Sequence, residues 1–346
     1  NALVANAQAQ AANFPFCTIE PNTGMVPVPD PRLAQINSII ETQKILPATV
    51  ELVDIAGLVR GASQGEGLGN QFLGHIRTVD AVLHVVRCFE DENIVHVEGS
   101  IDPIRDVEVV ETELLLKDIE TVEKRADKSR KLAKSGDKNL KVEAEMLTRL
   151  EGWLSDGKPA RTFEYSDPEA ETFKGLFLLT AKPVLYVANV DEDSVAEGNA
   201  LVERLREHAA NVGARVVIIS AAIEAEISEL DDEEKMEFLE GLGLEESGLD
   251  RLSREGYALL GLKTYFTAGE KEVRAWTIRD GMSAPQAAGV IHTDFERGFI
   301  RAEVIAYDDY ITLDGEAGAK SAGKLKVEGK DYIVQDGDVM HFRFNV

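Results

Sequence analysis

The chain has 346 residues, of which 62 are Asp or Glu and 37 are Lys or Arg, so its formal net charge is -25. A balance this acidic argues against broad non-specific binding of nucleic acids, and no DNA partner is expected. No apolar run approaches the roughly 20 residues of a membrane span. The two cysteines, Cys17 and Cys88, are too few for a disulfide scaffold. We therefore expect a cytoplasmic protein of two or three domains that does not bind membranes.

The chain starts at Asn1 with helix-forming, Ala- and Gln-rich sequence that continues to Ala12. It shows neither an initiator Met nor a first strand. Because a doubly wound domain begins with a strand, we expect that strand and the loop after it to precede Asn1. A gene sequence that lacks such a segment would refute this expectation.

The next segment, Asn13–Asn22, is irregular and has the sequence NFPFCTIEPN. Its Thr18 is a candidate metal ligand, because a loop hydroxyl can bind Mg²⁺ beside a phosphate. A lone threonine before a strand is more often only a strand residue. The metal interpretation therefore depends on a carboxylate further along the chain, Asp54.

The stretch Ala48–Phe72 predicts a strand, the motif Asp54-Ile-Ala-Gly57, a glycine-rich loop and the start of a helix. In an open parallel sheet, ligands bind beyond the carboxyl ends of the strands. A carboxylate such as Asp54 can hold Mg²⁺ there, and Gly57 would let a backbone N–H approach a terminal phosphate. A plain strand-to-helix turn is the alternative, since this motif occurs often by chance.

A second buried strand is predicted over Asp80–Cys88, followed by a loop over Phe89–Ser100. The loop should lie on the same side as Asp54, so His96 within it could position or deprotonate a water molecule. An exposed or packed histidine is the alternative. His84, inside the strand, is expected to be a packed core residue.

Helical spacing over Val107–Leu154, broken at Gly136-Asp137, predicts an antiparallel hairpin with its tip near Ser135–Asn139. The tip is rich in cations, namely Lys124, Arg125, Lys128, Arg130, Lys131, Lys134, Lys138 and Lys141. Such a run is usually a solvated helix face. Within a chain of net charge -25, however, it favours an arm that contacts RNA or a protein partner.

Two further buried strands are predicted over Pro183–Val190 and Ala214–Ile219. The four strands, with helices between them, are typical of a doubly wound, mainly parallel α/β sheet. From Leu262 onward, short strand-like runs separated by turns predict a small α+β domain.

Together these segments resemble the YchF family of Obg-like ATPases, which are translation-factor-class P-loop NTPases. The resemblance spans essentially the whole chain and rests on the joint order of six segments: Asn13–Asn22, Asp54–Ser63, His84–Asp91, Asn189–Glu192, Ser220–Glu224 and Asp331–Val346. It implies a nucleotide-binding G domain over 1–106 and 168–261, a helical insertion over 107–167 and a C-terminal β-grasp (TGS) domain over 262–346.

The resemblance also implies roles for individual residues. Thr18 would be the switch I ligand of Mg²⁺, and Asp54 to Gly57 would be the switch II motif. The residues Asn189, Val190, Asp191 and Glu192 stand where GTPases carry NKxD, and Ser220 and Ala221 belong to the last loop beside the base. The family's phosphate loop, GxxxxGKS/T, is absent from this sequence, and we expect it to precede Asn1.

The resemblance implies ATP in preference to GTP, and the residues offer a physical reason. The NKxD aspartate accepts hydrogen bonds from guanine N1–H and the 2-amino group, both of which adenine lacks. Here Glu192 is one methylene longer and Val190 replaces the lysine, so the site is relaxed for guanine and compatible with adenine. Asn189 can still bond the N7/N6 edge.

Many GTPases carry a water-orienting Gln directly after DxxG, but Leu58 occupies that position here. We therefore expect slow hydrolysis or a residue from elsewhere, with His96 as the candidate. The leading prediction is a slow ATPase switch that binds the ribosome, through its large subunit, or RNA. The alternative is a nucleotide-gated regulator, including a stress or redox response through Cys17, in which hydrolysis is incidental.

Overall fold

The computed structural model describes residues 22–55, 68–94, 96, 99–134 and 136–345. These fall into two compact units. The first comprises residues 22–24 and 52–249, and the second comprises residues 25–51 and 250–345. The domain bounds implied by the family resemblance place residues 25–51 in the nucleotide-binding domain, whereas in the structure they pack with residues 250–345.

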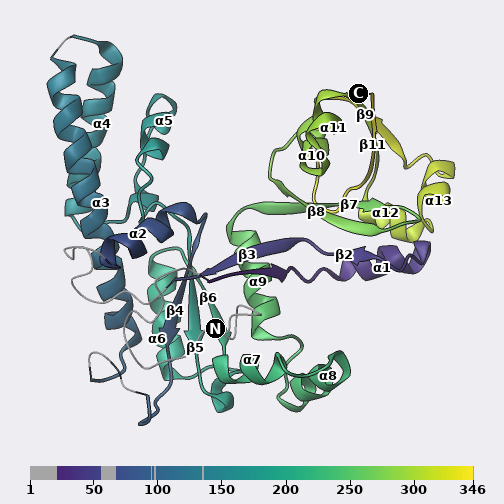
Figure 1. Cartoon of the computed structure of the whole chain (residues 1–346), viewed down its shortest axis with the longest axis horizontal. Helices are drawn as coiled ribbons and strands as arrows, with labels where there is room; N and C mark the ends of the chain where they lie inside the picture. Colours follow the sequence, from purple (N-terminus) through teal and green to yellow (C-terminus); the bar gives the residue numbers. More distant parts are fainter. Residues whose placement is uncertain (1–21, 56–67, 95, 97–98, 135, 346) are drawn as a thin grey trace. The chain divides into compact units, whose positions relative to one another are not determined.

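The first unit is built on three parallel strands in the order β4-β5-β6 (Figure 1). They are β4 (Val82–Arg87), β5 (Val184–Asn189) and β6 (Arg215–Ile219). Arg87 pairs in register with Asn189, and Asn189 pairs with Ile219, so all three strands end at one edge. Apolar side chains from β5 and β6 pack with those of surrounding helices in one buried cluster. The α/β class expected from the sequence is confirmed.

The fourth predicted strand does not join this sheet in the described chain. It is β3 (Thr49–Asp54), which pairs with β1 (Asn22–Pro27) in a separate two-stranded sheet. Its Thr49 and Glu51 are exposed while the residue between them is half-buried, which is typical of a strand with one solvated face. In this the structure differs from the four-stranded sheet expected from the sequence.

Helices flank the sheet and extend beyond it. The helices of the first unit are α2 (Leu68–Thr78), α3 (Pro103–Ala133), α4 (Lys138–Ser155), α5 (Asp167–Gly175), α6 (Ala200–Asn211), α7 (Ala221–Ile227) and α8 (Asp232–Gly241), with short 3₁₀ turns η1 (Ala160–Thr162) and η2 (Glu192–Ser194). None of the described helices combines the length and apolar character needed to cross a membrane.

Helices α3 and α4 lie side by side as the predicted hairpin (Figure 1). Asp102 caps α3 by accepting from the N–H groups of Ile104 and Arg105, and Pro103 occupies the first turn. Asp137 caps α4 in the same way. Facing apolar side chains then close the hairpin: Val122, Ala126, Met146, Leu147 and Leu150 are all fully buried.

One buried carboxylate fastens α3 to the chain that precedes β5. Asp118, which is 0% exposed, accepts from the backbone N–H of Leu179 at 2.8 Å and of Thr180 at 2.7 Å. The Thr180 hydroxyl also donates to it at 2.6 Å. Three donors satisfy a charge that would otherwise be costly to bury.

The second unit contains a mixed sheet in the order β10-β9-β11-β7-β8-β2. Its strands are β2 (Ile45–Leu46), β7 (Leu262–Ala268), β8 (Val273–Arg279), β9 (Phe299–Ile305), β10 (Lys326–Glu328) and β11 (Val339–Phe344). Its helices are α1 (Pro31–Ile40), α9 (Gly248–Leu259), α10 (Ala284–Ile291), α11 (Thr293–Arg297), α12 (Tyr307–Thr312) and α13 (Glu316–Ser321). β11 pairs with β7 in parallel, and their other neighbours, β9 and β8, run antiparallel to them. The assignment of this domain as a β-grasp module stays a prediction.

Residues 25–51 belong to this unit because their apolar side chains complete its core. Leu33 and Ile36 of α1 are buried with Phe266 of β7, and β2 extends the sheet beside β8. Arg32 pairs with Asp30 and with Asp336 and lies over the Phe266 ring. Helical spacing predicted α1 itself, but spacing does not indicate which distant sheet a helix will cover.

Candidate functional site

The carboxyl ends of β5 and β6 bring together the residues predicted to lie beside a base. The side-chain Oδ1 of Asn189 accepts a hydrogen bond from the Ala221 N–H at 2.9 Å. The Val190 N–H donates to the Ile219 carbonyl at 2.9 Å. Because parallel strands end at a common edge, two sequence motifs about thirty residues apart form one surface.

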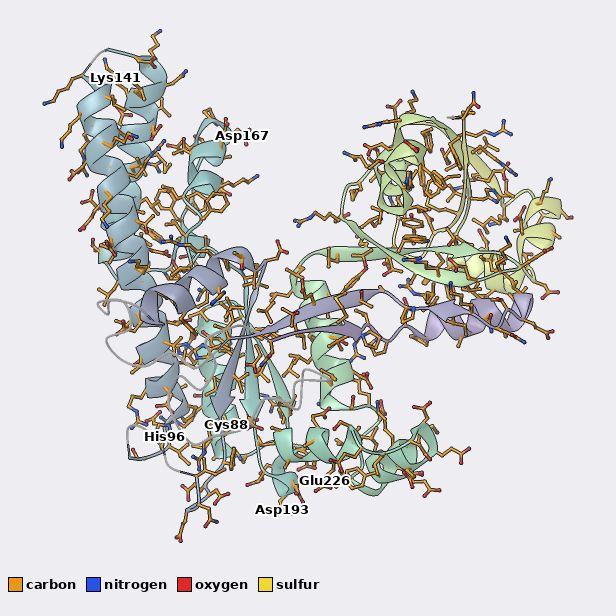
Figure 2. All side chains as sticks on the ribbon, viewed as in Figure 1. Cys88, His96, Lys141, Asp167, Asp193 and Glu226 are labelled. Carbon is orange, nitrogen blue, oxygen red and sulfur yellow. The ribbon has the colours of Figure 1, made fainter. Side chains whose placement is uncertain are left out.

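Ser220 gives this edge an unusual buried polar atom. The residue is 1% exposed, and its Oγ has no hydrogen-bond partner in the described part of the chain. Buried hydroxyls are nearly always bonded in folded proteins, so this atom needs a partner that the described residues do not supply. Glu192 begins η2, three residues after the end of β5, and is exposed. Figure 2 shows the neighbouring Asp193 and, in α7, Glu226 beyond these strand ends.

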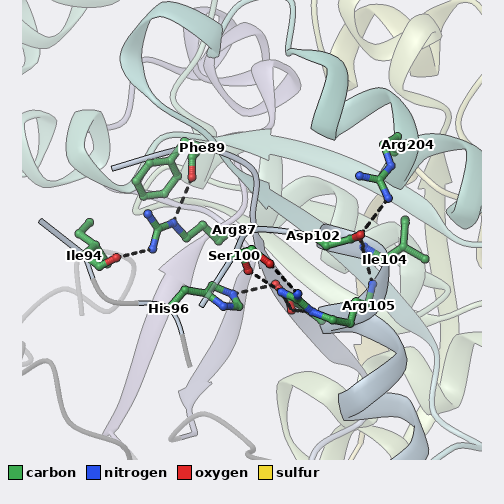
Figure 3. A network of polar contacts seen from close by, with 10 residues as sticks. Arg87, Phe89, Ile94, His96, Ser100, Asp102, Ile104, Arg105 and Arg204 are labelled. Carbon is green, nitrogen blue, oxygen red and sulfur yellow. Dashed lines mark hydrogen bonds and ion pairs between the residues drawn. The ribbon is translucent and has the colours of Figure 1, made fainter. Parts of the chain in front are cut away.

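The loop after β4 is held by Arg87, a residue that the sequence analysis did not single out. Its guanidinium donates to the backbone carbonyls of Phe89 (3.1 Å) and Ile94 (3.0 Å) and lies over the Phe89 ring (Figure 3). It also donates to the backbone carbonyl of Asp91 at 3.1 Å. One cation thereby organises the loop that leads to His96. An arginine at the end of a buried strand, followed by a polar loop, is the signal that could have found it.

His96 contacts the first turn of the helical hairpin. Its Nε2 lies 2.9 Å from Asp106 Oδ2, and both side chains are largely buried (Figure 3). Arg105 donates to the same carboxylate and to the carbonyl and hydroxyl of Ser100. The Asp102 cap also pairs with Arg204 of α6. The loop is therefore fixed at its start by Arg87 and at its end by α3.

His84 within β4 and Cys88 directly after it have structural roles. His84 lies beside the Tyr186 ring, and burial lowers its pKa to about 4, so it is neutral at pH 7. Burial raises the pKa of the Cys88 thiol to about 12, which keeps it unreactive. His84 thus fits the expected packed residue. Cys17, the other candidate for redox chemistry, lies outside the described residues.

The predicted metal and phosphate residues are described only in part. Thr18, Gly57 and Leu58 lie outside the described residues. Asp54 is the half-buried last residue of β3, and Ile55 after it packs against the buried cluster formed by Leu73, Ile76, Leu114 and Leu179. The described contacts therefore do not connect Asp54 with the edge formed by Asn189.

The predicted pair, Thr18 and Asp54, offers donor atoms that suit a magnesium ion. A threonine hydroxyl and an Asp carboxylate are oxygen donors of the kind that Mg²⁺ prefers, and Mg²⁺ commonly takes only one or two protein ligands together with phosphate and water. In the described part of the chain, no cluster of three or more His, Cys, Asp or Glu side chains could hold a metal ion. A site rich in protein ligands is thus absent from that part.

Two protein-family models match the sequence. The model described as a 50S ribosome-binding GTPase matches residues 1–128. The model of the C-terminal domain of YchF GTPases, described as a protein of unknown function, matches residues 262–345. The second match covers the part of the second unit that runs from β7 through β11.

Individual proteins are similar over nearly the whole chain. The ribosome-binding ATPase YchF of Bacillus subtilis is 56% identical over 345 residues, covering 99% of this chain and 94% of that protein. The protein of the same name from Haemophilus influenzae is 58% identical over 346 residues, covering 100% and 95%. The structure of the Schizosaccharomyces pombe YchF GTPase matches with a TM-score of 0.85 and 38% identity, covering 99% of this chain and 93% of that chain.

Proposed function

Because the chain belongs to the YchF family of Obg-like ATPases, we propose that it is a slow, Mg²⁺-dependent ATPase switch that associates with the ribosome in the cytoplasm. The names of its relatives support triphosphate hydrolysis and ribosome association. The observation that carries the nucleotide assignment is the bond from Ala221 N–H to Asn189, which joins the two motifs beside the base. ATP turnover measured with and without ribosomes tests the proposal, and a rate that rises with ribosomes is expected.

The preference for ATP follows from the residues after β5. Asn189 Oδ1 is already engaged by Ala221, which fixes the amide so that its NH₂ can face a base. Glu192 replaces the shorter aspartate of NKxD and Val190 replaces its lysine, so nothing in this motif is matched to the guanine-specific donors. Adenine offers N7 and an exocyclic amine, which Asn189 and the Val190 backbone can meet.

Replacing Glu192 by Asp is expected to increase GTP affinity by about three- to tenfold, which is on the order of 1 kcal/mol and matches one added hydrogen bond. ATP affinity should change little. Titration of both nucleotides into a protein that carries an intact phosphate loop measures the effect. Glu197→Asp, the same change at an exposed position nearby, is the control. If the unmodified protein already prefers GTP, the explanation for the base preference is wrong.

Within the site, we assign Thr18 and Asp54 to Mg²⁺, and Gly57 to the terminal phosphate. When bound, the metal would neutralise charge that develops on the transferred phosphoryl group. His96 would accept the proton of the attacking water, because Leu58 after the DxxG motif is apolar and cannot orient it. The hydrolysis rate should then depend on the contacts that hold the loop after β4, because His96 lies on that loop.

Ribosome contact is assigned to the tip of the α3–α4 hairpin. Arg125 and Arg130 pair across the hairpin with Glu143 and Glu151. By contrast, the side chains of five exposed lysines of the tip form no ion pair or hydrogen bond in the described part of the chain: Lys128, Lys131, Lys134, Lys138 and Lys141. Figure 2 shows Lys141 near the end of the hairpin, where such side chains can reach RNA phosphates.

The double substitution Lys134→Gln/Lys138→Gln is expected to weaken ribosome binding and to reduce the slope of log affinity against log salt by about two, because each lost phosphate contact removes the release of about one counterion. Binding measured by co-sedimentation at several salt concentrations gives both quantities. Lys174→Gln/Lys271→Gln removes the same charge from exposed positions elsewhere and should leave the slope unchanged. An unchanged slope in the tip variant would exclude RNA phosphates as its contact.

A further inference from the structure

The start of helix α9 is held by a carboxylate that belongs to another helix. The side chain of Glu224, in the first turn of α7, accepts from the backbone N–H of Gly248 at 2.7 Å and of Leu249 at 3.2 Å. Each bond uses a different oxygen, Oε1 for Gly248 and Oε2 for Leu249. The first N–H groups of a helix have no acceptor within that helix, so Glu224 satisfies two of them. The residue is 5% exposed, which shields both bonds from water.

The backbone of Glu224 bonds the loop at the end of β6. Its N–H donates to the Ser220 carbonyl at 3.0 Å. The residue after Ser220 is Ala221, whose N–H donates to Asn189 Oδ1 at 2.9 Å. One residue therefore bonds this loop through its backbone and the start of α9 through its side chain. A movement of α7 away from α9 would displace the donor that fixes the Asn189 amide.

A close approach between Gly248 and Ile219 connects α9 to the second hydrogen bond between the ends of β5 and β6. A Cβ at Gly248 would lie 2.9 Å from Ile219 Cγ2 and 2.8 Å from Glu224 Oε1, which is closer than side chains pack. Ile219 is 1% exposed, and its carbonyl accepts from the Val190 N–H at 2.9 Å. Glycine at position 248 therefore lets the helix start pack against both residues that support these strand ends.

We infer that Glu224 is a positioning residue for nucleotide binding, which holds α7 against the start of α9 so that Ala221 keeps the Asn189 amide turned toward the base. This inference rests on the proposed role of Asn189 in binding adenine. Glu224 acts on the base end of the nucleotide and not on the phosphates. Affinity for ATP should therefore depend on Glu224, whereas affinity for a triphosphate without a base should not.

The test is Glu224→Gln, with Glu226→Gln as the control that makes the same change at an exposed position of the same helix (Figure 2). The amide has one accepting oxygen instead of two, so its NH₂ would face one of the two backbone N–H groups. ATP affinity is expected to fall about three- to tenfold, the loss that corresponds to one hydrogen bond to the base. Affinity for inorganic tripolyphosphate and kcat at saturating ATP should stay unchanged.

Gly248→Ala tests the same contact from the other side. The added methyl group must displace Ile219, Glu224 or the helix start, so ATP affinity should again fall while tripolyphosphate affinity does not. Gly256→Ala is the control on the same helix, because a Cβ there meets no atom of the described residues within 4 Å. Titration of both ligands with Mg²⁺, into protein with an intact phosphate loop, measures all four variants.

A measurement that needs no substitution is hydrogen exchange at the Gly248 and Leu249 amides of the unmodified protein. ATP is expected to slow this exchange more than tripolyphosphate does, because only ATP carries a base that orders the Asn189 amide and the loop bonded to it. Equal exchange with the two ligands would overturn the inference, even if both variants proved unstable.

The affinities also distinguish failure of this inference from failure of the proposed function. Unchanged ATP affinity in Glu224→Gln and Gly248→Ala, while Asn189→Ala binds ATP more weakly, would overturn the role of Glu224 alone. An equal loss of ATP and tripolyphosphate affinity in Glu224→Gln would overturn it as well, because the residue would then support the whole unit. Unchanged ATP affinity in Asn189→Ala would remove the proposed contact with the base and the role of Glu224 together.

Discussion

Replacement of His96 by Ala is expected to lower kcat for ATP hydrolysis by about 100-fold, the lower part of the range for a general base, with ATP affinity close to the unmodified value. The residue after DxxG is Leu58, so the side chain at that position cannot orient the attacking water. His96 is also not among the residues assigned to the adenine base, so its replacement should leave ATP binding intact. Single-turnover hydrolysis with saturating ATP and Mg²⁺, on protein with an intact phosphate loop, measures the loss.

His341→Ala is the matched control, because His341 is an exposed histidine of β11 in the second unit. Its removal should leave turnover unchanged. Equal rates for the His96 variant and the unmodified protein would exclude His96 from the mechanism. The slowed His96→Ala variant also separates the two functions that the sequence left open. If its ATP-dependent partner binding persists without turnover, a nucleotide-gated regulator is favoured over a switch that requires hydrolysis.

The edge formed by Asn189 and Ala221 was predictable because its signals are local. The run Val184–Ala188 is almost entirely apolar, as expected of a buried parallel strand, and it ends in Asn189. The second motif, Ser220-Ala221, follows β6 in the same way. Parallel strands bring their ends together, so adjacency in the sheet follows once both strands are identified. The hairpin was predicted for the same reason, from helical spacing on both sides of Gly136.

The missed features depend on partners that spacing does not reveal. Residues 25–51 were misassigned because β2 and α1 complete a sheet and a core whose other strands lie far away in the chain. The position of Asp106 could have been predicted from the sequence. Asp102-Pro103 is a helix-start signature, so α3 begins before the predicted Val107 and places Asp106 in its first turn. The contact of His96 with Asp106 could not be predicted from the sequence, because only the folded loop held by Arg87 brings the two side chains together.

Replacement of Asp118 by Ala is expected to lower the free energy of unfolding of the first unit by about 3 kcal/mol, because buried donors left without an acceptor cost roughly 1–3 kcal/mol each and some relax. The donors are the N–H groups of Leu179 and Thr180 and the Thr180 hydroxyl. Urea unfolding followed by Trp153 fluorescence in a Trp276→Phe background measures this unit alone, since the chain has 2 Trp.

Asp127→Ala is the control on the same helix. Asp127 is 70% exposed and pairs only with Arg130 at 3.2 Å among its described ion pairs, so its loss should cost less than about 1 kcal/mol. Equal costs for the two variants would show that Asp118 does not anchor α3.

Because Asp118 anchors α3, Asp118→Ala should also loosen the helix whose first turn contacts His96. Turnover of Asp118→Ala should then be reduced even without denaturant, whereas Asp127→Ala should keep its rate. A stable hairpin base is therefore a condition for the proposed chemistry, and the losses of stability and of turnover should appear together.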